Sequence, residues 1–406
     1  MTRFAPANLD ELRDAVGTAL AAEEPVEVLG GGSKRGLGRP LQTAHTLDLS
    51  RLAGIRDYAP SELVLTAGGA TPLALIERVL SKNNQMLAFE PPDWRALLGT
   101  DAAEPTLGGV LACNLSGPRR FKAGAARDHF LGFRAVSGRG EIFKAGGKVV
   151  KNVTGYDLCK LMTGSYGTLA ALEEVTVKVL PCPGTMATVL FAAIEPGASV
   201  RLMGVALGSP HEVSGAAYLP EATARVLGVP LQGGVVALRI EGPLPSVAFR
   251  RDSLMCEHAG SGATEVFADE ASAAFWRAVG NAAPLVGLDE RAVWRISVAP
   301  VRGVEVAQAI ARTLDTAWFL DWGGGLLWAA VPEQDDAGAA RIRTAVRGAD
   351  GRGTGHATLV KGSPGLRRAV PVFEPQPVAL AALSQRVKHA FDPRHILNPG
   401  RMVEGI

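Results

Sequence analysis

Residues 30–38 read Gly-Gly-Gly-Ser-Lys-Arg-Gly-Leu-Gly, and they decide the fold because they directly follow the short apolar segment 26–30. That segment predicts a β-strand. A glycine-rich turn after a strand exposes successive backbone N–H groups, and such a concave nest binds anions, typically a pyrophosphate. Ser33 can add its hydroxyl, and Lys34 or Arg35 can lie near the charge. The alternative interpretation is a flexible surface turn.

The spacing of these glycines differs from that of two widespread nucleotide-binding loops. The pattern G-x-x-x-x-G-K-[ST] of the P-loop is absent, and no G-x-G-x-x-G follows the first predicted strand. Neither a P-loop fold nor a Rossmann fold is therefore predicted.

A second glycine cluster occupies residues 106–117, Thr-Leu-Gly-Gly-Val-Leu-Ala-Cys-Asn-Leu-Ser-Gly. Gly108 and Gly109 precede an apolar segment with helical character, and amides at a helix start would face a second phosphate or a ribose. Asn114 and Ser116 add side-chain donors. The alternative is close helix packing by small residues.

A third cluster extends over residues 147–169. Its glycine-bracketed loop carries an unusual set of candidate cofactor contacts, namely Lys151, Asn152, Thr154, Gly155 and Tyr156. Gly164 and Gly167 could let the backbone approach a flat ring. The alternative is an ordinary solvated loop and helix end.

The element pattern predicts an α+β protein in several parts. Residues 8–22 have helical periodicity, with Asn8 as N-cap and Glu11 completing a capping box. The β-turn-α rhythm predicts two small lobes, 1–57 and 58–180, and the Pro-Cys-Pro-Gly breaker at 181–184 predicts a boundary. We expect an α+β cap with a mainly antiparallel sheet over 181–365, and a C-terminal helix and tail over 366–406.

Composition narrows the function classes. The 406 residues are 47% hydrophobic and 20% charged, with a net charge of +2, so a packed protein is expected and a nucleic-acid binder is not. The four cysteines form no C-x-x-C pair, which predicts free buried thiols rather than an iron–sulfur or zinc site. Without a signal-peptide pattern or a long apolar stretch, a cytoplasmic protein is expected, with any inner-membrane contact made through partner subunits.

The order of these motifs, ending in Leu-Asn-Pro-Gly-Arg-Met at 397–402, resembles the vanillyl-alcohol-oxidase/PCMH class of FAD-linked oxidases. Residues 114–120 and 151–162 resemble more closely the E-type subunits of bacterial glycolate oxidases. The resemblance implies a two-lobed PCMH-type FAD-binding domain, a cap, and a C-terminal segment that returns to the FAD domain. It also implies oxidation of glycolate, a small 2-hydroxy acid, to glyoxylate in a complex with a D-type flavoprotein subunit and an iron–sulfur subunit.

The resemblance further assigns roles to the three glycine clusters. Gly30, Gly31, Gly32, Ser33 and Lys34 would hold the FAD pyrophosphate, while Gly108, Gly109, Asn114 and Ser116 would lie along the dinucleotide. The third-cluster residues named above would meet the ribityl chain or the ring. Many members attach FAD through a histidine in the first loop; that loop has none here and His45 lies outside it, so non-covalent binding is expected.

Oxidation of a 2-hydroxy acid needs a cation for the carboxylate and a base for the hydroxyl proton. Candidate cations are Arg119, Arg120, Arg127 and Arg295, and His356 is the candidate base. Arg119 and Arg120 could equally be a surface pair, and His356 a structural histidine. Sister subunits carry closely spaced histidines for a metal in the cap; no such set is present, so no metal is expected. Two alternatives stay open: a stand-alone FAD-dependent 2-hydroxy-acid dehydrogenase, and a non-catalytic scaffold.

Overall fold

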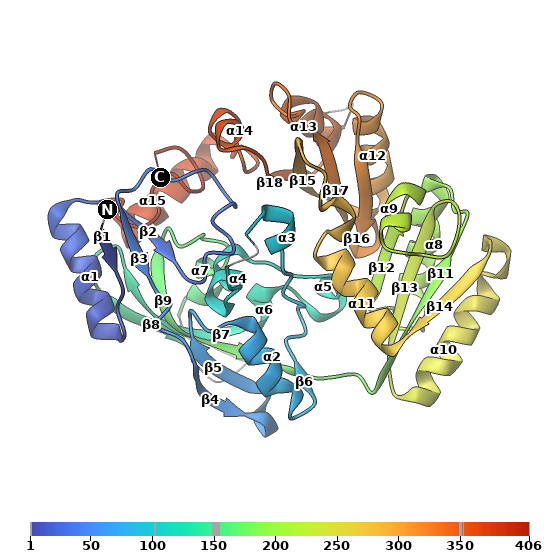
Figure 1. Cartoon of the computed structure of the whole chain (residues 1–406), viewed down its shortest axis with the longest axis horizontal. Coiled ribbons are helices and arrows are strands. Elements are labelled where there is room, and N and C mark those ends of the chain that lie inside the picture. The colour runs from blue at the N-terminus through green and yellow to red at the C-terminus, as the bar shows by residue number, and fades with distance from the viewer. Residues whose placement is uncertain (1, 101–102, 148–154, 349–350, 352, 406) are drawn as a thin grey trace.

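A computed structural model describes residues 2–100, 103–147, 155–348, 351 and 353–405. Figure 1 shows an N-terminal body, which contains β1 to β9, beside a second body, which contains β11 to β18 and is called the cap below. The α+β class predicted from the sequence is confirmed. The boundaries at residues 57, 180 and 365 stay predictions.

A three-stranded parallel sheet opens the N-terminal body, in the order β1 (Thr2–Phe4), β3 (His45–Asp48), β2 (Val26–Leu29). Helix α1 (Leu9–Ala22) begins as predicted, because the Asn8 side chain accepts from the Glu11 N–H at 2.9 Å. The Glu11 carboxylate accepts from the Asn8 side-chain amide and from the Ala7 backbone N–H, both at 2.8 Å. Leu12 and Val16 of α1 are buried together with Leu47. The apolar stripe of α1 therefore packs on this sheet.

A five-stranded antiparallel sheet completes the N-terminal body. Its order is β4 (Ile55–Ala59), β5 (Val64–Gly68), β9 (Ala170–Lys178), β7 (Phe130–Ser137), β8 (Ile142–Gly146). Six helices belong to this part: α2 (Leu73–Ser81), α3 (Arg95–Leu98), α4 (Leu107–Cys113), α5 (Arg120–Ala123), α6 (Ala126–His129) and α7 (Leu158–Met162). Short strands β6 (Gln85–Met86) and β10 (Leu180–Pro181) pair on the way to the cap.

The cap is built on an eight-stranded antiparallel sheet. Its order is β14 (Thr264–Ala268), β11 (Thr185–Phe191), β13 (Val235–Gly242), β12 (Gly215–Leu219), β16 (Ala317–Asp321), β17 (Leu326–Pro332), β15 (Arg291–Val298), β18 (Gly355–Lys361). Its helices are α8 (Pro196–Gly208), α9 (Glu221–Val226), α10 (Leu244–Glu257), α11 (Asp269–Gly280), α12 (Gly303–Ala311) and α13 (Ala339–Arg347). Helix α13 begins at Ala339, directly after Gly338, which has a left-handed φ of 71°.

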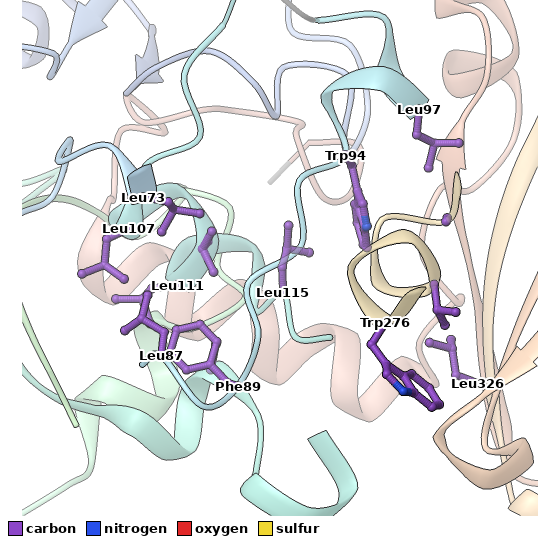
Figure 2. Close-up of a cluster of buried hydrophobic side chains, with 14 of the residues drawn as sticks. Leu73, Leu87, Phe89, Trp94, Leu97, Leu107, Leu111, Leu115, Trp276 and Leu326 are labelled. Atoms are coloured by element: carbon purple, nitrogen blue, oxygen red, sulfur yellow. The ribbon is translucent and has the colours of Figure 1, made fainter. Parts of the chain in front are cut away.

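Apolar side chains join the two bodies. Figure 2 shows Phe89, Trp94 and Leu111 of the N-terminal body in the same cluster as Trp276 and Leu326 of the cap. The Trp94 indole also donates to the carbonyl of Gly280 at 3.0 Å. The contact is therefore a continuous core rather than a hinge.

The C-terminal segment returns to the N-terminal body, as predicted. After α14 (Pro364–Ala369) and α15 (Val378–Phe391), the tail pairs Leu397 with Val26 of β2 in a parallel bridge. Figure 1 shows α15 beside the sheet that contains β2. This return brings the end of the chain to the glycine turn.

All four cysteines are free thiols, as expected, but burial varies: Cys159 is buried whereas Cys256 is exposed. Within the described residues, no helix is long and apolar enough to cross a membrane.

Candidate functional site

The glycine turn lies at the carboxyl end of β2 and presents unpaired amides. The backbone N–H groups of Gly30, Gly31, Gly32 and Lys34 donate to no atom in the part of the chain that the structure describes. Gly32 has a left-handed φ of 82°. A side chain on Gly31 would place its Cβ 1.8 Å from the Glu104 carbonyl oxygen. The turn therefore has the backbone shape of an anion nest, and only glycine fits at its centre.

A cleft opens over this turn. Its lining comes from several distant parts of the sequence: the turn, the segment around Gly69, the second glycine cluster, the end of the third cluster at Tyr166 and Gly167, and a C-terminal group. The lining residues that matter below are Gly30 to Lys34, Gly69, Gly108, Gly109, Cys113, Tyr166, Gly167, Asn398 and Arg401. The structure thus gathers the predicted turn and Gly108-Gly109 in one cleft.

Lys34 is one of the cations that line this cleft, together with Arg35 and Arg401. Its Nζ lies 3.1 Å from the Ser33 hydroxyl, and its aliphatic stem would lie 3.6 Å from a Cβ on Gly109. Burial lowers the pKa of Lys34. An anion beside this ammonium would regain part of the solvation that burial removes.

The backbone N–H groups of Gly108 and Gly109 are already bonded within the protein, so these residues offer the cleft room rather than hydrogen-bond donors. The Gly108 N–H donates to the Gly69 carbonyl at 2.8 Å, and the Gly109 N–H donates to Oγ1 of the N-cap Thr106 at 3.3 Å. A Cβ on Gly108 would lie 2.5 Å from the Gly69 oxygen. These glycines therefore allow close backbone packing at the cleft wall, which is the alternative weighed from the sequence.

Asn114 and Ser116 have different environments. Asn114 ends α4 with a φ of 51°, and its buried Oδ1 has no hydrogen-bond partner within the described chain. The Ser116 hydroxyl instead accepts from the Ala126 N–H at 2.9 Å. Because a buried oxygen without a hydrogen-bond partner costs free energy, Asn114 is suited to accept a hydrogen bond from a ligand. Ser116 instead stabilises the fold through its bond to Ala126.

The third cluster reaches the cleft through residues other than those singled out. Lys151, Asn152 and Thr154 lie outside the described residues, and Gly155 and Tyr156 are exposed. Tyr166 and Gly167 line the cleft instead. Gly167 is a glycine that the sequence marked for close approach, and a Cβ there would lie 2.7 Å from the Asn398 amide.

Sequence reasoning missed two C-terminal residues of the cleft. Asn398 accepts from the Val28 N–H at 2.8 Å and donates to the Tyr166 carbonyl at 2.7 Å. Arg401 is buried, donates to the carbonyls of Arg35 and Leu37, and pairs with Glu27 at 3.0 Å. The signal available was an amide and a guanidinium in an otherwise apolar tail, Leu-Asn-Pro-Gly-Arg.

Arg120 and Arg295 meet at one aromatic ring. Their guanidinium carbons lie 4.4 Å and 4.9 Å from the Trp322 ring centroid. Arg295 Nε is buried without a hydrogen-bond partner among the described residues. Burial and the charge of Arg120 lower the pKa of Arg295 to about 10, with Tyr166 and Asp321 opposing them. Neither guanidinium forms an ion pair with a carboxylate of the described residues, and two cations packed together in this way favour binding of an anion.

His356 lies on the same face of the cap sheet as Arg295. His356 of β18 lies opposite Ser297 of β15, and Thr358 lies opposite Arg295. Because side chains two positions apart on a strand point to the same face of the sheet, these four side chains share one face. Partial desolvation and the charge of Arg295 lower the pKa of His356, with Glu374 opposing. The imidazole is thus neutral near pH 7 and able to accept a proton.

Arg119 is placed elsewhere. It pairs with Glu241 of β13 at 2.5 Å and with Glu90 at 3.3 Å, and Arg239 pairs with Glu90 at 2.8 Å. This four-charge cluster joins the N-terminal body to the cap. Both carboxylates of the cluster pair with the Arg119 guanidinium. The assignment of Arg119 as a substrate-binding cation therefore stays a prediction, and no geometry in the structure supports it.

Residues 3–146 match the model of a family described as "FAD binding domain". Over 397 residues the chain is 34% identical to the glycolate oxidase subunit GlcE of Escherichia coli K12, covering 96% of each chain. The chain belongs to the GlcE family. The glycolate oxidase subunit GlcD of Bacillus subtilis is 32% identical over 189 residues, which are 46% of this GlcE-family chain and 38% of the GlcD chain.

Solved structures establish the fold of this GlcE-family chain over nearly its whole length. The 4-ethylphenol oxidase of Gulosibacter chungangensis superimposes with a TM-score of 0.72 at 13% identity, covering 99% of this chain and 89% of that one. A p-cresol methylhydroxylase gives 0.71 at 12% identity, covering 99% and 88%. Both matches show the fold alone. Among the described residues, no group of three or more His, Cys, Asp or Glu side chains is arranged to hold a metal ion.

Proposed function

We propose that this chain holds FAD non-covalently in the cleft and acts as the FAD-bearing subunit of a glycolate oxidase complex. Its partners would be a D-type flavoprotein subunit and an iron–sulfur subunit, which carry the electrons onward. The observation that supports this most is that the amides of Gly30, Gly31, Gly32 and Lys34, unpaired within the described chain, line a cleft in a chain of the GlcE family.

The residues present fit FAD. The glycine turn and Lys34, which line the cleft, would hold the pyrophosphate. Asn114 is not itself among the lining residues but directly follows Cys113, which is, and its unpartnered Oδ1 would accept a hydrogen bond from the ribityl or ring end. Among the described lining residues there is no histidine, and burial raises the pKa of the Cys113 thiol to about 11, so it stays protonated and weakly nucleophilic. Bound FAD would supply the acceptor for a hydride.

We place the substrate side where the cap meets α5 of the N-terminal body. Arg295 and Arg120 would hold the carboxylate of a 2-hydroxy acid, since guanidinium forks match carboxylate geometry. His356 would take the hydroxyl proton on its neutral imidazole. The same gathering favours a second candidate, a stand-alone 2-hydroxy-acid dehydrogenase.

The two candidates differ in what the isolated chain does with substrate. For the subunit, whose substrate side would act only in the assembled complex, the purified chain reconstituted with FAD is expected to be yellow and to stay yellow when glycolate is added without oxygen. Bleaching by glycolate alone supports the stand-alone enzyme. A chain that stays colourless after reconstitution removes both candidates and leaves the non-catalytic scaffold.

A pair of variants at Gly32 tests where the pyrophosphate lies. Asp and Asn are nearly isosteric and both tolerate the left-handed φ of 82° at this position, so they differ mainly in charge. Gly32→Asp is expected to bind FAD about tenfold or more weakly than Gly32→Asn, with the gap narrowing at high salt. Fluorescence titration with FAD measures both. Equal affinities for the two variants would place the phosphates away from the turn.

A further inference from the structure

Helix α15 packs on the rest of the protein through a buried lysine, Lys388. In this helix, which the structure describes in full, Lys388 is the one buried residue, and it is only 1% exposed. Its Nζ donates to the Thr168 carbonyl at 2.7 Å and to the Leu397 carbonyl at 2.9 Å, and pairs with Asp392 at 2.6 Å. All three ammonium donors are therefore satisfied inside the protein.

The partner of Lys388 organises the turn that follows the helix. Asp392 is fully buried, and its carboxylate accepts from the backbone N–H groups of Ile396 at 2.9 Å and Leu397 at 2.8 Å. A buried ion pair adds little net free energy of folding, but it requires its two charged groups to keep one defined geometry. The pair thus specifies one path for the chain between the helix and the tail.

That path leads directly to the cofactor cleft. Leu397, held by both members of the pair, forms the bridge with Val26, and the next residue is Asn398. Asn398 ties Val28 to Tyr166, while Arg401 holds the carbonyls on the far side of the glycine turn. Among the described residues, those lining the cleft include Asn398 and Arg401 but neither Lys388 nor Asp392.

We infer that Lys388 and Asp392 are positioning residues for the cofactor, which lock the C-terminal tail so that Asn398 and Arg401 hold the glycine turn in its binding shape. The inference rests on the proposed occupation of the cleft by FAD. In this inference the buried pair maintains the geometry of the cleft and does not act on overall stability alone.

Two variants test this role. Lys388→Met leaves the Asp392 carboxylate buried without its cation, and the double variant Lys388→Met/Asp392→Asn removes both charges, so that it keeps the fold if the single variant does not. Both are expected to weaken FAD binding about tenfold or more, because shells that orient direct contacts have effects of this size. Both are also expected to speed hydrogen exchange at the amides of Val28 and Asn398 in the FAD-free chain, since these amides depend on the tail.

A stability-matched control separates positioning from general weakening. Ile342→Ala removes a fully buried side chain from the cap core and is expected to lower the melting temperature without changing FAD affinity or those two amides. FAD affinity within twofold of wild type in both tail variants, with unchanged exchange, would overturn the inference. If wild type itself binds no FAD, the cofactor proposal fails, while faster exchange in the FAD-free variants still supports the tail lock.

Discussion

Gly31→Ala is expected to abolish FAD binding by this chain. A Cβ at residue 31 would lie 1.8 Å from the carbonyl oxygen of Glu104, a backbone atom that cannot rotate away. The two strands of chain must separate, which breaks the bond from the Glu104 N–H to the Gly31 carbonyl and changes the direction of the neighbouring amides. A distortion costing about 3 kcal/mol corresponds to about a hundredfold loss of affinity.

A control exists in the same loop. Gly36 has no left-handed φ, and a Cβ there would lie 3.6 Å from the Leu98 side chain, which is ordinary contact. Gly36→Ala is expected to keep wild-type flavin content. The measurement is the flavin-to-protein ratio, from visible absorbance, after reconstitution and gel filtration. Full flavin content in Gly31→Ala would show that the turn does not contact the cofactor.

Glu241→Gln is expected to lower the free energy of unfolding by about 3 kcal/mol near neutral pH. Glu241 is the cap residue that pairs with Arg119, and it lies 3.7 Å from Arg239. The neutral amide leaves these two buried guanidinium groups with Glu90 as the remaining carboxylate of the cluster. Both bodies share the cluster, so the loss also weakens the contact between them.

The pH dependence gives a sharper test. Arg239 and Arg119 overcome the effect of burial and lower the pKa of Glu241 from 4.5 to about 2. Because the folded pKa is depressed, the stabilisation is complete above about pH 5 and is lost as the pH falls towards 2. Wild type is therefore expected to lose about 3 kcal/mol more than Glu241→Gln over that window in urea unfolding.

The matched control for Glu241→Gln is a surface pair. Glu270 pairs with Arg277, and both side chains are exposed, so Glu270→Gln is expected to change stability by about 0.5 kcal/mol or less. Parallel acid unfolding curves for wild type and Glu241→Gln would contradict the role assigned to the cluster.

The sequence was most informative where structure is local. The cap of α1 by Asn8, and the glycine turn after β2, both follow from residues within a few positions of each other. Strand β12, Gly-Ala-Ala-Tyr-Leu, was not predicted because it is buried on both faces and shows no alternation. Short runs of small residues carry little strand signal.

Long-range partners were beyond the sequence. Asn398 and Arg401 reach the cleft only because the tail crosses to β2, more than 350 residues away in the chain. Arg119 was assigned to substrate because its neighbour across the body interface, Glu241, is 122 residues distant. The charge and hydrogen-bonding capacity of a side chain follow from the residue type alone. Which residue it pairs with depends on the complete fold.

The central claim is that unpaired amides of the Gly30–Lys34 turn bind the pyrophosphate of FAD. Calorimetric titration of the cofactor-free chain with FAD and with riboflavin, which lacks the pyrophosphate and the adenosine attached to it, tests it most directly. We predict one FAD per chain and a riboflavin affinity about a thousandfold lower, because about 4 kcal/mol of the binding would come from the pyrophosphate together with the adenosine that it carries. Equal affinity for the two flavins would contradict the account.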